Sequence, residues 1–165
     1  MNLRTAAASP LRLHLSGGGL CWRLPFCRAE LRSALAAMLA GAGPAELDLV
    51  LVRDGAMSAY NRRYMACHGP TNVLSFPLDE PLAETEGTPT DALPDGNAPV
   101  QLGSLVLSVD TLHREARLYG QDLREHCLRL LAHGLGHLAG YDHGPEMDSL
   151  CTDMLSAAED WLNNQ

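Results

Sequence analysis

The chain has 165 residues, of which 46% are apolar, and a formal net charge of −8. This length suits one domain with its own core, so we expect residues 1–165 to form a single domain. No apolar run is long enough to span a bilayer, and the first residues mix arginine, proline and glycine. These features argue against a membrane protein and a secretory signal peptide, and they favour a cytoplasmic protein.

The negative charge is unevenly distributed. Residues 1–77 hold eight arginines and four acidic residues, whereas residues 78–99 hold six acidic residues and no basic one. All twelve basic residues are arginine, the side chain best suited to bidentate phosphate binding. The overall charge therefore does not exclude a polyanionic partner. The five cysteines are scattered without a C-x2-C pair, as expected of reduced thiols.

The hydrophobic pattern alternates between strand and helix periods along the first half of the chain. Residues 11–15 and 46–53 are predicted strands, and a helix is predicted between them over residues 26–40. A short helix is predicted over residues 55–65, and residues 71–76 after it are predicted to form a strand because they resemble a strand of a known family. This half of the chain therefore contributes three strands and two helices to the predicted fold.

The second half begins with residues 78–99, which are acidic, rich in proline and without periodicity, and which we expect to form a loop. A strand is predicted over residues 101–109. The predicted helices that follow cover residues 110–119, 121–139 and 145–161. Asp110 is the predicted N-cap of the first of them. The order of elements predicts an α+β fold, with a small mixed four-stranded sheet packed against about five helices.

Three histidines are grouped at the end of the long helix predicted over residues 121–139. His133 and His137 lie one helical turn apart and project from the same face. Gly140 is suited to the left-handed conformation that ends a helix, and the turn after it would bring His143 towards the other two. Three neutral imidazoles with one coordination position left open are typical of a catalytic zinc site. The spacing therefore predicts one Zn²⁺ per chain in a hydrolytic site.

The H-x3-H-x5-H spacing matches that of metzincin peptidases, in which a glutamate after the first histidine is the general base. Gly134 stands at that position here, so we predict a metzincin-like central metal helix without peptidase chemistry. The catalytic residues stay unknown at this level. Asp142 is interpreted either as a carboxylate that orients a ligand histidine or as a turn residue. His126 is interpreted as a structural histidine rather than a fourth ligand.

The histidine segment, residues 133–143, resembles the signature of the YbeY family of metal-dependent endoribonucleases. Residues 61–64, 70–77 and 102–108 are similar to other segments of that family and occur in the same order. The resemblance implies a zinc-dependent endoribonuclease that acts in ribosomal RNA maturation and ribosome quality control. It also implies ribosomal RNA and the small ribosomal subunit as partners.

Three positions depart from the family pattern: Met65 replaces an arginine, Ser104 an aspartate and Gly136 a leucine. They leave two alternatives open. One is a ribosome-associated zinc protein with reduced or lost nuclease activity, and the other is a zinc hydrolase of another phosphoester or amide. For a nuclease, the attacking group is either a zinc-activated water or the 2′-hydroxyl of the RNA.

Overall fold

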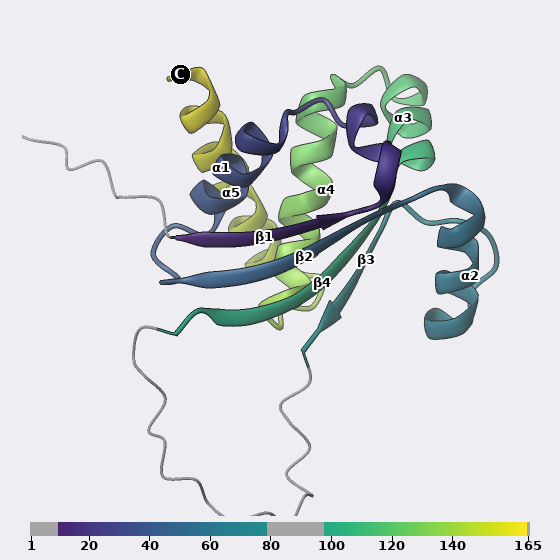
Figure 1. The fold of residues 1–165 in the computed structure, drawn as a ribbon, viewed down its shortest axis with the longest axis horizontal. Coiled ribbons are helices and arrows are strands. Elements are labelled where there is room, and N and C mark those ends of the chain that lie inside the picture. Colours follow the sequence, from purple (N-terminus) through teal and green to yellow (C-terminus); the bar gives the residue numbers. More distant parts are fainter. Residues whose placement is uncertain (1–9, 79–97, 165) are drawn as a thin grey trace, which may run out of the picture.

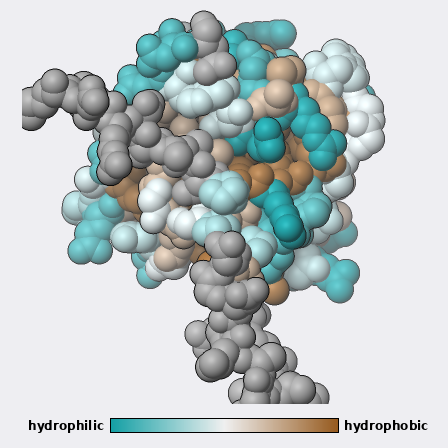
Figure 2. Space-filling model, turned by 60° about the vertical axis from the view of Figure 1, so that its left-hand side comes forward, coloured by the Kyte–Doolittle hydropathy of each residue, from teal (hydrophilic) through white to brown (hydrophobic). Residues whose placement is uncertain are grey.

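The structure is a computed structural model that describes residues 10–78 and 98–164 (Figure 1). Most of the loop predicted over residues 78–99 lies outside the described residues. In the part of the chain that the structure describes, no helix combines the length and the apolarity needed to cross a membrane. On the face drawn in Figure 2, a patch of hydrophobic surface lies next to hydrophilic side chains.

The four described strands form one mixed sheet, as predicted. In spatial order they are β1 (Leu11–Ser16), β2 (Ala45–Val52), β4 (Val100–Ser108) and β3 (Val73–Pro77). The pairs β1–β2 and β2–β4 are parallel, whereas β3 runs antiparallel to β4. The short strand β3 is therefore an edge of the sheet, and one of its sides is free of strand pairing within the described residues.

Among the described residues, five α-helices accompany the sheet, in agreement with the predicted number. They are α1 (Arg28–Met38), α2 (Asp54–Met65), α3 (Val109–Leu118), α4 (Leu123–Leu138) and α5 (Pro145–Asn163). A short 3-10 helix, η1 (Gly18–Arg23), is an addition that the sequence pattern did not indicate. In Figure 1, α1, α4 and α5 lie behind the strands and α2 lies beside the β3 end of the sheet.

The sheet is covered unequally on its two faces. The larger core joins one face to α1, α4 and α5 through fully buried leucines such as Leu49, Leu105 and Leu131. A smaller cluster on alternate strand positions, including Leu74 and Val106, packs under α2. Because burial of apolar surface is the main stabilising term, α4 is held firmly in the centre of the larger core.

The start of α3 differs from the prediction. Ser108, rather than Asp110, is the N-cap, since its side chain accepts a hydrogen bond of 3.2 Å from the Thr111 backbone N–H. Strand β4 continues directly into α3, so the helix begins earlier than the polar pattern indicated. The carboxylate of Asp110 instead accepts a hydrogen bond of 3.1 Å from the Asp54 backbone N–H.

Candidate metal centre

The three histidines of the predicted site lie together. His133 and His137 come from α4, and His143 comes from the turn between α4 and α5. One nitrogen of each ring can be chosen so that the three atoms lie within 4.8 Å of one another. Gly140 has a φ of +86°, so the backbone makes the left-handed turn that this position favours. The turn brings His143 to a ring-centroid distance of 4.7 Å from His137.

The ring of His137 is oriented by the backbone. Its Nδ1 lies 3.0 Å from the carbonyl oxygen of Tyr141, so Nδ1 carries the proton and donates it to that oxygen. The free lone pair is then on Nε2, which lies 3.2 Å from the Nε2 of His133. Two nitrogen ligands of a tetrahedral zinc are separated by about 3.3 Å, given Zn–N bonds of about 2.0–2.1 Å. The donor set and this spacing fit a zinc ion.

The surroundings favour the neutral form of His133. Burial lowers the pKa of His133 below its ordinary value, and the neighbouring His137 and His143 lower it further, against a smaller opposing effect of Asp148. A neutral imidazole keeps the lone pair that a metal requires. No carboxylate among the described residues forms an ion pair with any of the three histidines.

Two polar residues near the cluster have different surroundings. Within residues 10–78 and 98–164, the carboxylate of Asp142 makes no hydrogen bond to His133, His137 or His143. The histidine that is oriented by a hydrogen bond is His137, and its partner is the Tyr141 carbonyl instead of Asp142. His126 lies outside the cluster and is only 6% exposed, with its Nε2 2.9 Å from the Glu115 carboxylate. His126 is therefore placed as a structural histidine.

Two glycines let α4 approach its neighbours closely. A Cβ on Gly134 would lie 2.8 Å from Cδ2 of Leu105, and one on Gly136 would lie 2.9 Å from Cε of Met147. The carbonyl of Gly134 also accepts a hydrogen bond of 3.0 Å from the hydroxyl of Ser75 in β3. The position that carries the base in metzincins therefore faces the packed sheet here, and a long carboxylate there would displace core side chains.

The histidines line a groove of about 520 Å³ between α4, the edge strand β3 and the end of α2. Met65 is among the lining residues and is 46% exposed. Ser104 lies away from the groove and its hydroxyl is 3.4 Å from the Asp48 carboxylate. Of the three departures from the family pattern, Met65 is thus the one that contacts the groove, whereas Gly136 packs against α5.

A chain of hydrogen bonds supports the wall of the groove and was not predicted. The Nδ2 atom of Asn72 donates to both carboxylate oxygens of Glu115, at 3.3 and 3.1 Å. Its Oδ1 accepts the Val73 N–H at 2.7 Å, and Glu115 contacts His126 on the metal helix. The start of β3 is therefore tied to α3 and α4. Because these partners are distant in sequence, no local pattern indicated the chain.

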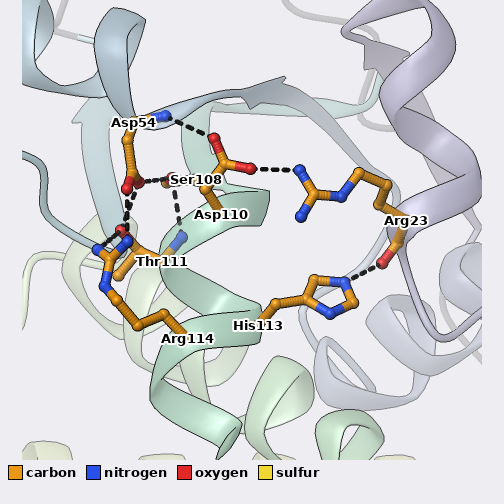
Figure 3. A network of polar contacts seen from close by, with 7 residues as sticks. All are labelled: Arg23, Asp54, Ser108, Asp110, Thr111, His113 and Arg114. Carbon is orange, nitrogen blue, oxygen red and sulfur yellow. Dashed lines mark hydrogen bonds and ion pairs between the residues drawn. The ribbon is translucent and has the colours of Figure 1, made fainter.

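A second group of polar side chains lies where η1, α2 and α3 meet (Figure 3). We call it the polar cluster, and its members are Arg23, Asp54, Ser108, Asp110, Thr111, His113 and Arg114. The Asp54 carboxylate accepts hydrogen bonds of 2.7 Å from both Ser108 and Thr111. It also accepts one of 2.5 Å from the Arg114 guanidinium. These bonds join the starts of α2 and α3.

The two carboxylates of the polar cluster are held in the charged form. The hydrogen bond from Arg23 lowers the pKa of Asp110 below its ordinary value. Burial raises the pKa of Asp54, but the hydrogen bonds led by Thr111 and Arg114 outweigh it and leave that pKa lowered. Each aspartate therefore faces an arginine, and the polar cluster is a network of ion pairs and hydrogen bonds suited to stabilising the fold.

Comparisons with known proteins agree with this geometry. The endoribonuclease YbeY family model matches residues 27–164. The endoribonuclease YbeY of Nitratidesulfovibrio vulgaris is 50% identical over 136 residues, which cover 78% of this chain and 82% of the relative. That of Oleidesulfovibrio alaskensis is 43% identical and covers 81% of this chain and 84% of the relative. The solution structure of a Thermotoga maritima protein is similar in fold, with a TM-score of 0.55 and 20% identity over 93% of each chain. The chain therefore belongs to the endoribonuclease YbeY family.

Proposed function

We propose that this chain is a zinc-dependent endoribonuclease that cleaves ribosomal RNA during its maturation, with the small ribosomal subunit as its partner. Residues 1–165 act as one domain, in the cytoplasm. The observation that carries the proposal is the approach of His133, His137 and His143 ligand atoms to within 4.8 Å, in a chain that belongs to an endoribonuclease family.

The proposed ligands of a single Zn²⁺ are His133, His137 and His143. Imidazole nitrogens suit zinc, whereas magnesium and calcium prefer oxygen ligands. A zinc held by three neutral ligands lowers the pKa of a coordinated water to about 7 and stabilises negative charge on phosphoryl oxygens. The hydrogen bond between His137 and the Tyr141 carbonyl supports the proposal, because it keeps the Nε2 lone pair directed at the cluster.

Other residues in the groove and beside it have separate roles in the proposed reaction. Asp142 carries the only carboxylate among the described groove residues, which makes it the candidate proton acceptor. Arg62 and Arg63 are exposed on the last turn of α2 and provide positive charge for phosphates beside the groove. Ser75 and Asn72 are engaged with backbone groups or with Glu115, so their role is to hold the groove wall in place.

Both alternatives are less well supported. Family membership favours a nuclease over a hydrolase of another ester or amide. The packed surroundings of Gly134 also leave no room for the glutamate that assists amide hydrolysis in metzincins. A binding protein without activity does not need a groove that leads to the histidines, and neither Ser104 nor Gly136 lines that groove.

The test compares wild-type protein with His137→Ala and with a matched control, His68→Ala. His68 is an exposed histidine outside the cluster. We expect one zinc per chain and cleavage of a ribosomal RNA fragment for the wild type and for His68→Ala. His137→Ala, or wild type treated with a chelator, should lose both. Cleavage that persists in metal-free protein, or in His137→Ala, would contradict the proposal.

The same assay identifies the attacking group. A 2′,3′-cyclic phosphate at the end of the product indicates attack by the 2′-hydroxyl of the RNA. A simple phosphate end without a cyclic intermediate indicates attack by water.

A further inference from the structure

Three aromatic rings lie together at the side of the groove, where the end of α2 meets β3. The Tyr64 ring packs edge-on against Phe76, with a centroid distance of 5.0 Å and an interplanar angle of 71°. Tyr60 stacks near Tyr64, at 6.0 Å and 22°. We call Tyr60, Tyr64 and Phe76 the aromatic cluster. Its rings come from sequence segments that the proposed metal site leaves without a role.

The rings of the aromatic cluster are unequally exposed. Tyr60 and Phe76 are half-buried and belong to the smaller core under α2. Tyr64 is 51% exposed, and the next residue, Met65, is 46% exposed and lines the groove together with the histidines. Tyr60 and Phe76 therefore hold the Tyr64 ring in position from behind. The Tyr64 ring is half-exposed to solvent, and the residue that follows it, Met65, lines the groove.

The charge beside the exposed ring is positive. The guanidinium carbon of Arg63 lies over the Tyr64 ring, 5.4 Å from its centroid. Arg62 is exposed on the same helical turn, and neither arginine forms an ion pair with a described residue. A fixed aromatic ring flanked by arginines is the combination that binds single-stranded nucleic acid, because bases stack on the ring and phosphates meet the positive charge.

We propose that Tyr64 is a base-binding residue, on which one unpaired base of the RNA substrate stacks while the neighbouring phosphodiester lies in the groove. This inference rests on the proposed nuclease function and deepens it. Met65 supplies an apolar contact between the stacked base and the groove. The base takes the place of the Arg63 guanidinium over the ring, and Arg63 then binds a phosphate beside Tyr64. A paired base is held within a duplex and cannot stack in this way, so Tyr64 favours unpaired segments.

The test uses zinc-loaded protein and a short, cleavage-resistant RNA strand that carries the fluorescent base 2-aminopurine at one of several positions. Tyr64→Leu removes the ring but keeps an apolar side chain, and Tyr64→Phe keeps the ring. Tyr119→Leu is the matched control, because Tyr119 is a 66% exposed tyrosine at the end of α3, outside the groove. Melting temperatures of all variants identify any loss of folding.

We expect Tyr64→Leu to weaken single-strand binding by about 5- to 100-fold, the range expected for one stacked base. It should also abolish the fluorescence quenching seen at one position in the wild type. Tyr64→Phe and Tyr119→Leu should bind like the wild type, and a duplex of the same sequence should be little affected. If Tyr64→Leu unfolds, Tyr64→Trp replaces it, and indole quenching by the bound strand beyond that of Trp22 and Trp161 in the wild type reports stacking.

Wild-type affinity and quenching in Tyr64→Leu, an equal loss in Tyr64→Phe, or an unquenched indole in Tyr64→Trp would overturn the inference. If the wild type still cleaves RNA in that case, the proposed function stands without this role of Tyr64. A wild type that neither binds nor cleaves RNA overturns both proposals. If Tyr64→Leu loses binding of a protein but not of RNA, the surface serves a protein partner and the inference is wrong.

Discussion

The polar cluster and the histidine cluster gather polar side chains in opposite ways. In the polar cluster, Asp54 and Asp110 each face an arginine and several N–H or O–H donors (Figure 3). The histidine cluster brings three like groups together, and within the described residues no carboxylate pairs with them. In the polar cluster, the negative charges of both aspartates are thus balanced by partners within the protein. The histidine cluster has the donor set of a metal site, because three imidazole nitrogens converge there with no carboxylate of the described residues paired to them.

The two clusters therefore contribute differently to the protein. Hydrogen bonds between charged partners in the polar cluster stabilise the junction of η1, α2 and α3. The histidine cluster is the proposed metal site, and the packing of α4 that holds it comes from leucines rather than from the histidines themselves. We therefore expect substitutions in the polar cluster to change stability, and substitutions in the histidine cluster to change metal affinity.

The largest expected effect is the loss of zinc binding in His143→Ala. Even the loss of a residue that only supports a ligand costs about 10- to 100-fold in metal affinity, so loss of a ligand should cost more than about 100-fold. His143 is exposed, so the melting temperature of the metal-free protein should not change. Competition titration with a zinc chelator measures the affinity, and His68→Ala is the control. Wild-type affinity in His143→Ala would remove His143 from the ligand set.

The opposite pattern is expected for Asp54→Ala. This change leaves Ser108, Thr111 and Arg114 without their acceptor, and we expect the free energy of unfolding to fall by about 2 kcal/mol. Zinc affinity should stay at the wild-type value. Urea unfolding measures the change, and Asp153→Ala, at an exposed position of α5, is the control. If Asp54→Ala lost zinc binding but kept its stability, the assignment of stability to the polar cluster and of metal binding to the histidine cluster would be wrong.

The dependence of stability on pH should also come from the polar cluster. The pKa values of Asp54 and Asp110 are lowered in the folded protein, so the unfolded chain binds more protons as the solution becomes acidic. Their stabilising effect is complete above the ordinary pKa of about 3.9 and is lost as the pH falls through the lower folded values. In the double variant Asp54→Asn, Asp110→Asn, the urea midpoint should fall less steeply below about pH 5. If the urea midpoints of the wild type and the double variant fell equally steeply with pH, Asp54 and Asp110 would not be the source of the pH dependence.

The smallest effect is expected from alanine at the two glycines of α4. In Gly136→Ala, the new methyl group approaches the flexible end of Met147. The gain in helix propensity of about 1 kcal/mol offsets the cost of this close contact. Gly134→Ala meets Leu105 and Val73 in the packed core, so overpacking of about 1–3 kcal/mol should dominate. Thermal unfolding of the metal-free variants measures both changes. Gly134→Ala should be the less stable of the two, and equal stability would refute the tighter packing at Gly134.

Local rules explain what the sequence could predict. His133 and His137 share a helical face because of the helix repeat, and Gly140 supplies the left-handed turn before His143. The strands and helices followed from their hydrophobic periods, within a few residues at each end. The absence of the metzincin base was readable from Gly134 alone.

Long-range contacts explain what the sequence could not predict. Arg23 and Asp110 are separated by 87 positions, so nothing local indicated their pairing, and Asp110 was wrongly assigned as a helix cap. The edge position of β3, which forms a groove wall, depends on the strand order β1-β2-β4-β3. The orienting contact of His137 comes from the Tyr141 carbonyl, a backbone group that every residue has, so residue type could not reveal it.

X-ray absorption at the zinc edge of freshly purified wild-type protein identifies the atoms that bind the metal. We expect one zinc per chain with three imidazole nitrogens and one oxygen at about 2.0–2.1 Å, and no sulfur ligand. The chain also has five cysteines, whose sulfur atoms are alternative zinc ligands that the spectrum distinguishes from imidazole nitrogens. Zinc with sulfur neighbours at about 2.3 Å, or protein without zinc, would contradict the assignment of the three histidines as its ligands.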